Sequence, residues 1–128
     1  MNNYFSDGKV LQSKNAGDKI AALLEVPSES EIDLRNEYSN LINQQLPELA
    51  KQTPMPVRFN HCFARIVLDN LFEDCWYNHL SRKQPAYKQL GEAQMRKAIA
   101  IAQYIVNHPE RIEQLNQNSL RWRGKFRS

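Results

Sequence analysis

The stretch that follows residue 27 shows the first strong pattern of hydrophobic and polar positions. Ser28 and Glu31 form a Ser-x-x-Glu pair, in which each side chain can bond the backbone N–H of the other residue and so cap a helix start. Beyond this pair, apolar residues recur at the spacing of a helix face. Pro47 is expected either to kink the helix or to open a new turn. The residues that recur at this helical spacing are Leu34, Tyr38, Leu41, Ile42 and Gln45.

The longest apolar stripe runs over residues 59–80 and predicts one continuous helix. Its apolar positions are Phe59, Cys62, Phe63, Ile66, Val67, Phe72, Cys75 and Trp76. The opposite face is predicted to carry His61, Arg65, Asp69 and Glu73. On that face Arg65 can pair with Asp69, four residues further on. The polar row has two interpretations: a binding or proton-transfer row, or an exposed helix face stabilised by such pairs.

Prolines organise the N-terminal region and the middle of the chain. Residues 15–26 predict a short helix that Pro27 ends, and residues 1–13 predict an arm or a tail. Two prolines within residues 52–57 cannot continue a helix, and they favour extended geometry in their neighbours. We therefore place a linker between two subregions at this point.

After the stripe at 59–80, residues 81–91 are predicted to form a basic loop around Pro85. A helix is predicted over residues 92–107, and Pro109 suits the first position of a final helix. The inward positions of the helix at 92–107 are predicted to be Met95, Ala98, Ile99, Ala102, Ile105 and Val106.

These elements predict an all-α fold, a single small bundle of about five helices, to which a short extended N- or C-terminal arm can be added. The charge along the chain is uneven. Residues 1–54 hold 5 Lys/Arg and 8 Asp/Glu, a net charge of −3, whereas residues 55–128 hold 12 Lys/Arg and 6 Asp/Glu, a net charge of +6. We therefore predict an acidic N-terminal helical subregion and a basic C-terminal one within one compact domain. The basic half implies an acidic partner, which is nucleic acid, an acidic protein surface or the chain's own acidic half.

The composition of the 128 residues limits the cellular setting. No apolar run approaches the roughly 18–20 residues of a membrane span, so no membrane partner is expected. The N-terminus lacks the apolar stretch of a signal peptide, which predicts a cytoplasmic protein. The two cysteines fit a reducing compartment.

Residue types that bind metals or act as nucleophiles occur in the stripe at 59–80. Cys75 and His79, four residues apart, can share a metal on one helix face, but Cys62 and Cys75 would lie about 20 Å apart on one helix. We therefore predict buried structural cysteines, no metal and no cofactor. His61 and Cys62 are adjacent and point about 100° apart on a helix. Since the sequence also lacks a Gly-x-Ser-x-Gly elbow and a phosphate-binding glycine loop, no catalytic residue is predicted.

The C-terminus is the most distinctive segment of the chain. Its cations alternate with Trp122, Gly124 and Phe126, which on an extended arm places cations on one side and aromatic rings on the other. Arginines grip phosphates and exposed rings stack on bases; alternatively, Trp122 and Phe126 anchor the tail on the core. Partial docking of Trp122 is expected in either case. The predicted binding residues are Arg121, Trp122, Arg123, Lys125, Phe126 and Arg127, joined by Arg65, Arg82, Lys83 and Lys88.

Three segments within residues 55–126 resemble a small module of uncharacterised bacterial proteins. They read RFNHCFARIVLDNLFEDCW, PAYKQL and LNQNSLRWRGK, and the resemblance covers a little over half of the chain. Some proteins with this module are described as acetyltransferase-like, which implies a small transferase. The large acetyl-CoA-binding family uses a mixed β-sheet and a [Gln/Arg]-x-x-Gly-x-[Gly/Ala] loop. Neither feature is readable in this sequence, so no catalytic residue is carried over.

Three functional hypotheses follow from the sequence. The first is a non-enzymatic binding module whose basic C-terminal surface contacts nucleic acid. The second is a protein-interaction or inhibitor module that docks on an acidic protein, which can itself be one that handles nucleic acid. The third is a small transferase, so the sequence does not decide whether the chain is an enzyme, although a binding role is favoured.

Overall fold

A computed structural model describes residues 28–124 of the chain. The predicted helix at 15–26 and the predicted arm at 1–13 lie outside the described residues. The same is true of three predicted binding residues, Lys125, Phe126 and Arg127. The chain divides into two units, residues 1–33 and residues 34–128, and the packing given below is that of the second unit.

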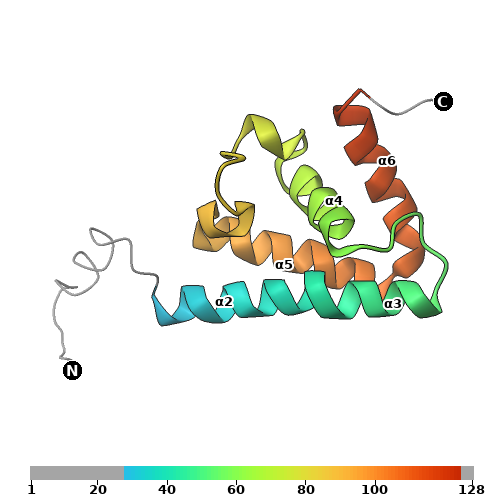
Figure 1. Cartoon of the computed structure of the whole chain (residues 1–128), viewed down its shortest axis with the longest axis horizontal. Coiled ribbons are helices and arrows are strands. Elements are labelled where there is room, and N and C mark those ends of the chain that lie inside the picture. The colour runs from blue at the N-terminus through green and yellow to red at the C-terminus, as the bar shows by residue number, and fades with distance from the viewer. Residues whose placement is uncertain (1–27, 125–128) are drawn as a thin grey trace, which may run out of the picture. The chain divides into compact units, whose positions relative to one another are not determined.

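The first described helix begins with the predicted capping box. In α2 (Glu29–Asn40), the Ser28 N–H donates to Glu31 Oε1 at 2.9 Å, and the Glu31 N–H donates to Ser28 Oγ at 3.2 Å. A wider, π-helical segment (Leu41–Gln45) follows and leads directly into α3 (Leu46–Gln52), so that the three form one rod (Figure 1).

Pro47 explains why the rod widens before α3. Proline has no N–H to give to the carbonyl of Asn43, and in a regular helix its ring would clash with that carbonyl. The Leu46 N–H bonds instead to Leu41 O, five residues back, which is the bonding of a π turn. Pro47 then occupies the first turn of α3, where no N–H is needed. Of the two predicted outcomes for Pro47, the structure therefore shows the new turn.

The predicted continuous helix at 59–80 is wrong in its second half. The helix α4 (Asn60–Phe72) ends at Glu73, which has the left-handed backbone (φ 54°) that terminates helices. A 3₁₀ turn (Trp76–Asn78) follows. Two carboxylates hold the new direction, since Asp69 accepts the N–H of Trp76 at 2.9 Å and Asp74 accepts the N–H of Cys75 at 2.8 Å. Side-chain bonds of this kind compete with the helical ladder.

Glu73 offers a direct test of this helix end. The left-handed conformation is sterically unfavourable for a residue with a Cβ and not for Gly. Part of this advantage of Gly is offset because Gly loses more conformational entropy on folding. We expect Glu73→Gly to raise the free energy of unfolding by about 0.5–1 kcal/mol. Glu73→Ala keeps the Cβ and should give no gain. Urea denaturation of both variants checks this, and a helix that truly continued past Glu73 would instead lose stability on introduction of Gly.

The basic loop at 81–91 is ordered by one amide side chain. Gln89 accepts the N–H of Ser81 at 2.8 Å through Oε1 and donates to Ser81 O at 2.8 Å through Nε2. Its last part is a 3₁₀ turn (Ala86–Gln89) that leads into the next helix. The two bonds of Gln89 close the loop on itself. Its residues 84–87 line a pocket together with residues of α4 and α2.

The last two helices follow the sequence pattern closely. The predicted helix at 92–107 is α5 (Glu92–Asn107), and of its predicted inward residues all are buried except the half-buried Val106. A 3₁₀ turn (Pro109–Arg111) then leads into α6 (Ile112–Trp122), so the final helix starts at Pro109 in 3₁₀ form.

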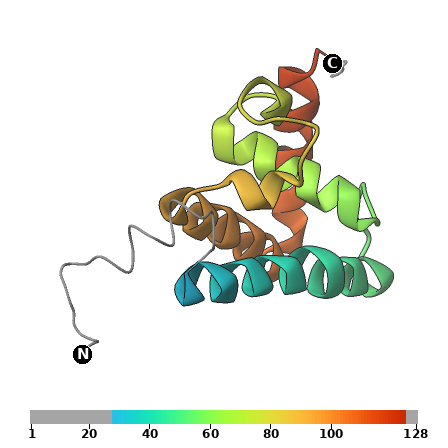
Figure 2. The same ribbon diagram turned by 60° about the vertical axis from the view of Figure 1, so that its left-hand side comes forward.

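The hydrophobic core joins all of these helices. α4 packs against α5, α6 and the π-helical segment, while α5 also contacts α3 (Figure 2). Residues 34–52 and residues 60–112, on either side of the predicted linker, thus contribute to the same core. The residues of that core that are fully inaccessible to solvent are Leu46, Phe63, Ile66, Val67, Ala98, Ala102 and Ile105.

The predicted all-α class is confirmed, because residues 28–124 contain helices and turns and no strand. No helix in this part of the chain combines the length and the apolar character that crossing a membrane requires.

Candidate binding groove

Asp69 does not lie on an exposed polar row, as the sequence predicted, but is fully buried. Its carboxylate accepts the Ser119 hydroxyl at 2.6 Å and the backbone N–H of Trp76. It also accepts two bonds from Arg123, at 2.6 Å from Nε and 3.1 Å from Nη2. Asp69 is buried because it lies on the face of α4 that packs against α6. Both interpretations of the polar row, as a binding row and as a solvated face, therefore fail at Asp69.

Arg65 is bound to α6 as well, and not to Asp69. Its Nη1 donates to Ser119 Oγ at 2.7 Å and its Nη2 to Asn116 Oδ1 at 2.9 Å. Burial lowers the pKa of Arg65, and the nearby positive charge of Arg123 lowers it further. One turn along, Asn70 donates to the backbone of α6 at Leu115 O. Two of the segments that carry the resemblance to a bacterial module thus bind each other in the folded chain.

The predicted extended arm at the C-terminus is wrong for residues 119–122, which continue α6. The alternation of cations and rings therefore does not place Arg121 and Arg123 on one side of a strand. The Arg123 side chain is 11% exposed, and its hydrogen bonds to Asp69 raise its pKa. Its charge is therefore used in an internal ion pair. Trp122 is half-buried, as expected for partial docking, while Arg121 is exposed and donates to Asn118 at 3.3 Å.

The three predicted binding residues of the loop at 81–91 are all exposed. Arg82 lies over the Tyr77 ring, with its Cζ 4.0 Å from the ring centroid. Arg123 also lies over this ring, at 4.6 Å. Lys83 and Lys88 show no contact of this kind within residues 28–124. The loop therefore contributes one cation, Arg82, to the neighbourhood of Arg65 and α6.

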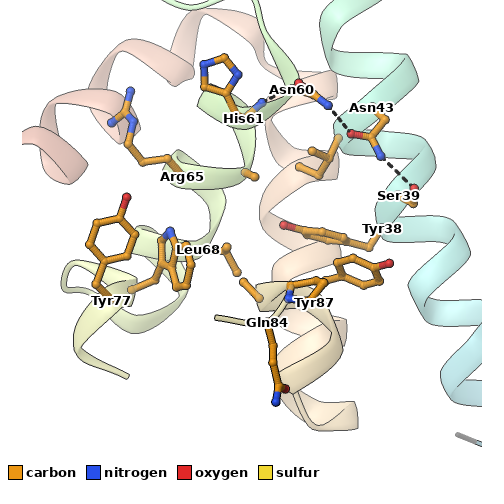
Figure 3. A pocket seen from close by; sticks show the side chains of 15 residues that line it. Tyr38, Ser39, Asn43, Asn60, His61, Arg65, Leu68, Tyr77, Gln84 and Tyr87 are labelled. Atoms are coloured by element: carbon orange, nitrogen blue, oxygen red, sulfur yellow. Dashed lines mark hydrogen bonds between the residues drawn. The ribbon is translucent and has the colours of Figure 1, made fainter. Parts of the chain in front are cut away.

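A pocket of about 480 Å³ opens between the first helical rod, α4 and the loop at 81–91 (Figure 3). Aromatic and aliphatic side chains form most of its wall, and a few amides, a histidine and an arginine complete it. Tyr38 and Tyr87 stack on one side, with ring centroids 6.2 Å apart. Its wall includes Tyr38, Ile42, Ala64, Leu68, Trp76, Tyr77, Ala86 and Tyr87 and the polar side chains of Asn43, Asn60, His61, Arg65 and Gln84.

A second cavity, of about 620 Å³, shares Asn43 and Asn60 with the first. Asn60 donates to Asn43 at 3.0 Å, and Asn43 donates to Ser39 at 2.9 Å (Figure 3). The two cavities meet at the bonded pair Asn43 and Asn60. We call the two cavities together the binding groove. The second cavity is completed by Pro47, Ala50, Lys51, Arg58 and Phe59.

Within residues 28–124, the binding groove is lined by positive side chains and by no negative ones. None of the lining residues in this part of the chain is an aspartate or glutamate, while Lys51, Arg58 and Arg65 are among them. Burial raises the pKa of Tyr38, so its phenol stays neutral and adds no charge. The groove therefore favours a ligand with an apolar part and a negative charge.

Phe59 was predicted to lie on the apolar stripe, and its exposure of 58% corrects that prediction. It stands at the edge of the binding groove, where it stacks on His61 at 5.8 Å and carries Arg58 over its ring at 5.6 Å. An exposed ring of this size is the kind of residue that protein interfaces cover.

The cysteines differ from their predicted environment. Cys62 and Cys75 are free and only half-buried, and since α4 ends at Phe72 they do not share a helix. The predicted spacing of about 20 Å along one helix therefore does not apply. Within residues 28–124, no group of three or more His, Cys, Asp or Glu side chains is placed to hold a metal ion.

Several residues of the binding groove were not predicted as site residues. Tyr38 and Trp76 fall on apolar stripes and were assigned to the core. Tyr77 lies in the predicted helix at 59–80 but outside its apolar stripe, and Tyr87 lies in the predicted basic loop. A signal was present in the aromatic content of residues 76–87, which is high for a loop. The sequence does not predict that this loop packs next to the rod at 34–52, which is what brings the two segments into one pocket.

Comparisons of the chain with protein-family models, with curated proteins and with solved structures found no match. The groove itself therefore carries the argument on function.

Proposed function

We propose that the chain is a non-enzymatic protein-interaction module that binds an acidic segment of a partner protein in its groove. The segment would insert apolar or aromatic side chains into the pocket of about 480 Å³. Mostly apolar walls with a few fixed polar groups are typical of sites that bind such anchors. An amphipathic helix is the form in which a polypeptide commonly presents anchors along a groove.

The observation that carries this proposal is that the described residues lining both cavities include lysine and arginine and no carboxylate. Charge complementarity across an interface steers partners together and disfavours partners of the wrong sign. Acidic residues that flank the anchors would meet Arg58 or Arg65, since Lys51 already pairs with Glu48 at 3.5 Å. The exposed ring of Phe59 would extend the contact beyond the cavities.

Nucleic acid is the other partner that the sequence predicted, and the geometry gives it less support. The arm that was expected to grip phosphates is helical up to Trp122, and Arg123 is paired with Asp69. The wall of the first pocket, moreover, is mostly apolar, whereas single-stranded nucleic acid usually follows a track of exposed cations. Binding of nucleic acid to the groove is therefore tested as the alternative in the experiment below.

Filling the pocket should weaken binding without unfolding the chain. Ala64 is half-buried on α4 and lines the pocket, whereas Ala100 is exposed on α5 and does not. We expect peptides selected from a random library against the wild-type chain to combine large apolar residues with Asp or Glu. Ala64→Leu should weaken the selected peptides by about tenfold or more, the loss expected for a central anchor, and Ala100→Leu should not.

Melting temperatures of both variants control for folding, and labelled single-stranded DNA and RNA form a parallel arm of the titration. The proposal fails if no selected peptide discriminates Ala64→Leu from Ala100→Leu. It also fails if oligonucleotides bind and only their binding is lost in Ala64→Leu, a result that would establish the groove as a nucleic-acid site.

A further inference from the structure

Three guanidinium groups gather around Tyr77 at the edge of the pocket. Arg82 and Arg123 both lie over its ring, at 4.0 and 4.6 Å from the centroid. Arg65 lines the same pocket as Tyr77 (Figure 3). Its guanidinium donates to Ser119 on α6, whose hydroxyl donates to Asp69, the ion-pair partner of Arg123. Among the side chains that contacts within residues 28–124 join to this cluster, Asp69 is the one carboxylate.

The charge of this cluster is not balanced inside the protein. Asp69 is fully buried and its ion pair is with Arg123, which accounts for one of the three positive charges. Arg65 bonds to Asn116 and Ser119, which are neutral, and Arg82 rests on an aromatic face. Arg65 thus lines the pocket, and Arg82 lies on the ring of Tyr77 at its edge, and neither forms an ion pair with a carboxylate within residues 28–124. The charge of the half-buried Arg65 is screened less than a surface charge.

Arg65 is also well prepared to receive an anion. Its two bonds to α6 fix the plane of the guanidinium and leave further N–H groups of the same fork for a ligand. A planar fork held in this way binds an oxyanion through two parallel bonds at little cost in side-chain entropy. Arg82 lies against Tyr77, which lines the same pocket, and adds a second positive charge at that edge.

We infer that Arg65 and Arg82 form an anion subsite beside the apolar pocket, which binds a carboxylate of the partner next to its apolar anchor. This inference rests on the proposed function and makes it more specific. The partner segment would carry an aromatic or large aliphatic residue for the pocket, with an Asp or Glu adjacent to it on the side of Tyr77. A phosphate group has the same oxyanion chemistry and could take the same place.

Small probes separate the subsite from the pocket. We choose 3-phenylpropionate, its neutral amide 3-phenylpropanamide, and phenyl phosphate, titrated at low ionic strength and followed by the NMR signals of the Trp76 indole and the Ala64 amide. The acid should bind about fivefold more tightly than the amide, which corresponds to about 1 kcal/mol, the upper range for a solvent-accessible ion pair. High salt should reduce the difference.

The matched variants are Arg82→Gln and Lys83→Gln, neighbouring exposed cations on one loop. Arg82→Gln should lower the ratio of acid to amide affinity to about twofold, while Lys83→Gln should leave it at the wild-type value. Arg65→Gln should abolish the preference, and since it also loses bonds to α6, its melting temperature is measured alongside. Tighter binding of phenyl phosphate than of the acid would identify phosphate as the preferred group.

Equal affinity of acid and amide for the wild-type chain overturns the subsite and leaves the apolar pocket, and with it the proposed function, intact. An acid preference that survives in Arg82→Gln and Arg65→Gln places the anion elsewhere and overturns the assignment of these two residues. If none of the probes binds, the subsite is likewise rejected, while the peptide selection described above still decides whether the groove binds a partner.

Discussion

Replacement of Asp69 by Ala is expected to lower the free energy of unfolding by about 3–5 kcal/mol, the cost of breaking a buried ion pair by removing one partner. The Arg123 side chain, 11% exposed, would keep its charge without a counter-ion. Ser119 and the backbone N–H of Trp76 would also lose their acceptor. Urea denaturation, with the slope of the transition fixed by the wild-type chain, measures the loss.

Two further variants make this prediction specific to the ion pair. In the double variant Asp69→Ala/Arg123→Met no uncompensated charge remains, so its loss should be smaller than the sum of the two single losses, by about 1–3 kcal/mol. Asp74→Ala removes an exposed carboxylate from the same segment and should cost far less than Asp69→Ala. Additive single losses would show that Asp69 and Arg123 do not act as a pair.

Truncation of Phe63 is expected to have an effect of similar size through packing alone. Phe63 is fully buried in the first turn of α4, and Phe→Ala at a fully buried position costs about 3–5 kcal/mol. Phe59, four residues earlier and 58% exposed, provides the matched control, since surface substitutions usually stay within about 0.5 kcal/mol.

The same pair of variants separates stability from binding. Phe59→Ala should leave the melting temperature near that of the wild-type chain and weaken peptides selected against the groove, because the ring stands at its edge. Phe63→Ala should show the opposite behaviour when binding is measured on the folded fraction. Equal destabilisation by the two variants would mean that the stripe faces the core along its whole length, as the sequence alone suggested.

The polar contact between α4 and α6 gives the groove a rigid border. Arg65 and Asp69, one turn apart on α4, are both bonded to Ser119 on α6. Side chains that carry their own supporting bonds hold a ligand more precisely than free surface side chains do. The same contact therefore serves stability through Asp69 and, in the function we propose, recognition through Arg65.

The sequence by itself determined the features that depend on neighbours along the chain. Helical periodicity located α5 and its inward face, the Ser28–Glu31 pair located the start of α2, and the prolines after Gln52 marked the break before α4. Each of these depends on side-chain spacing or on backbone restrictions within a few residues, which any reader of the sequence can follow. The all-α class follows from their sum.

Only the tertiary structure decided where the charges go and where the groove opens. Asp69 has the sequence spacing of an exposed residue, and it becomes buried because Ser119 and Arg123, about fifty residues later, supply its bonds. The bonds to Asp69 draw Arg123 out of the predicted arm. The same carboxylate accepts the N–H of Trp76, which holds the chain away from a helix after Phe72. The groove arises where a loop at 84–87 meets the rod at 38–43, and no local pattern encodes a contact between segments so far apart.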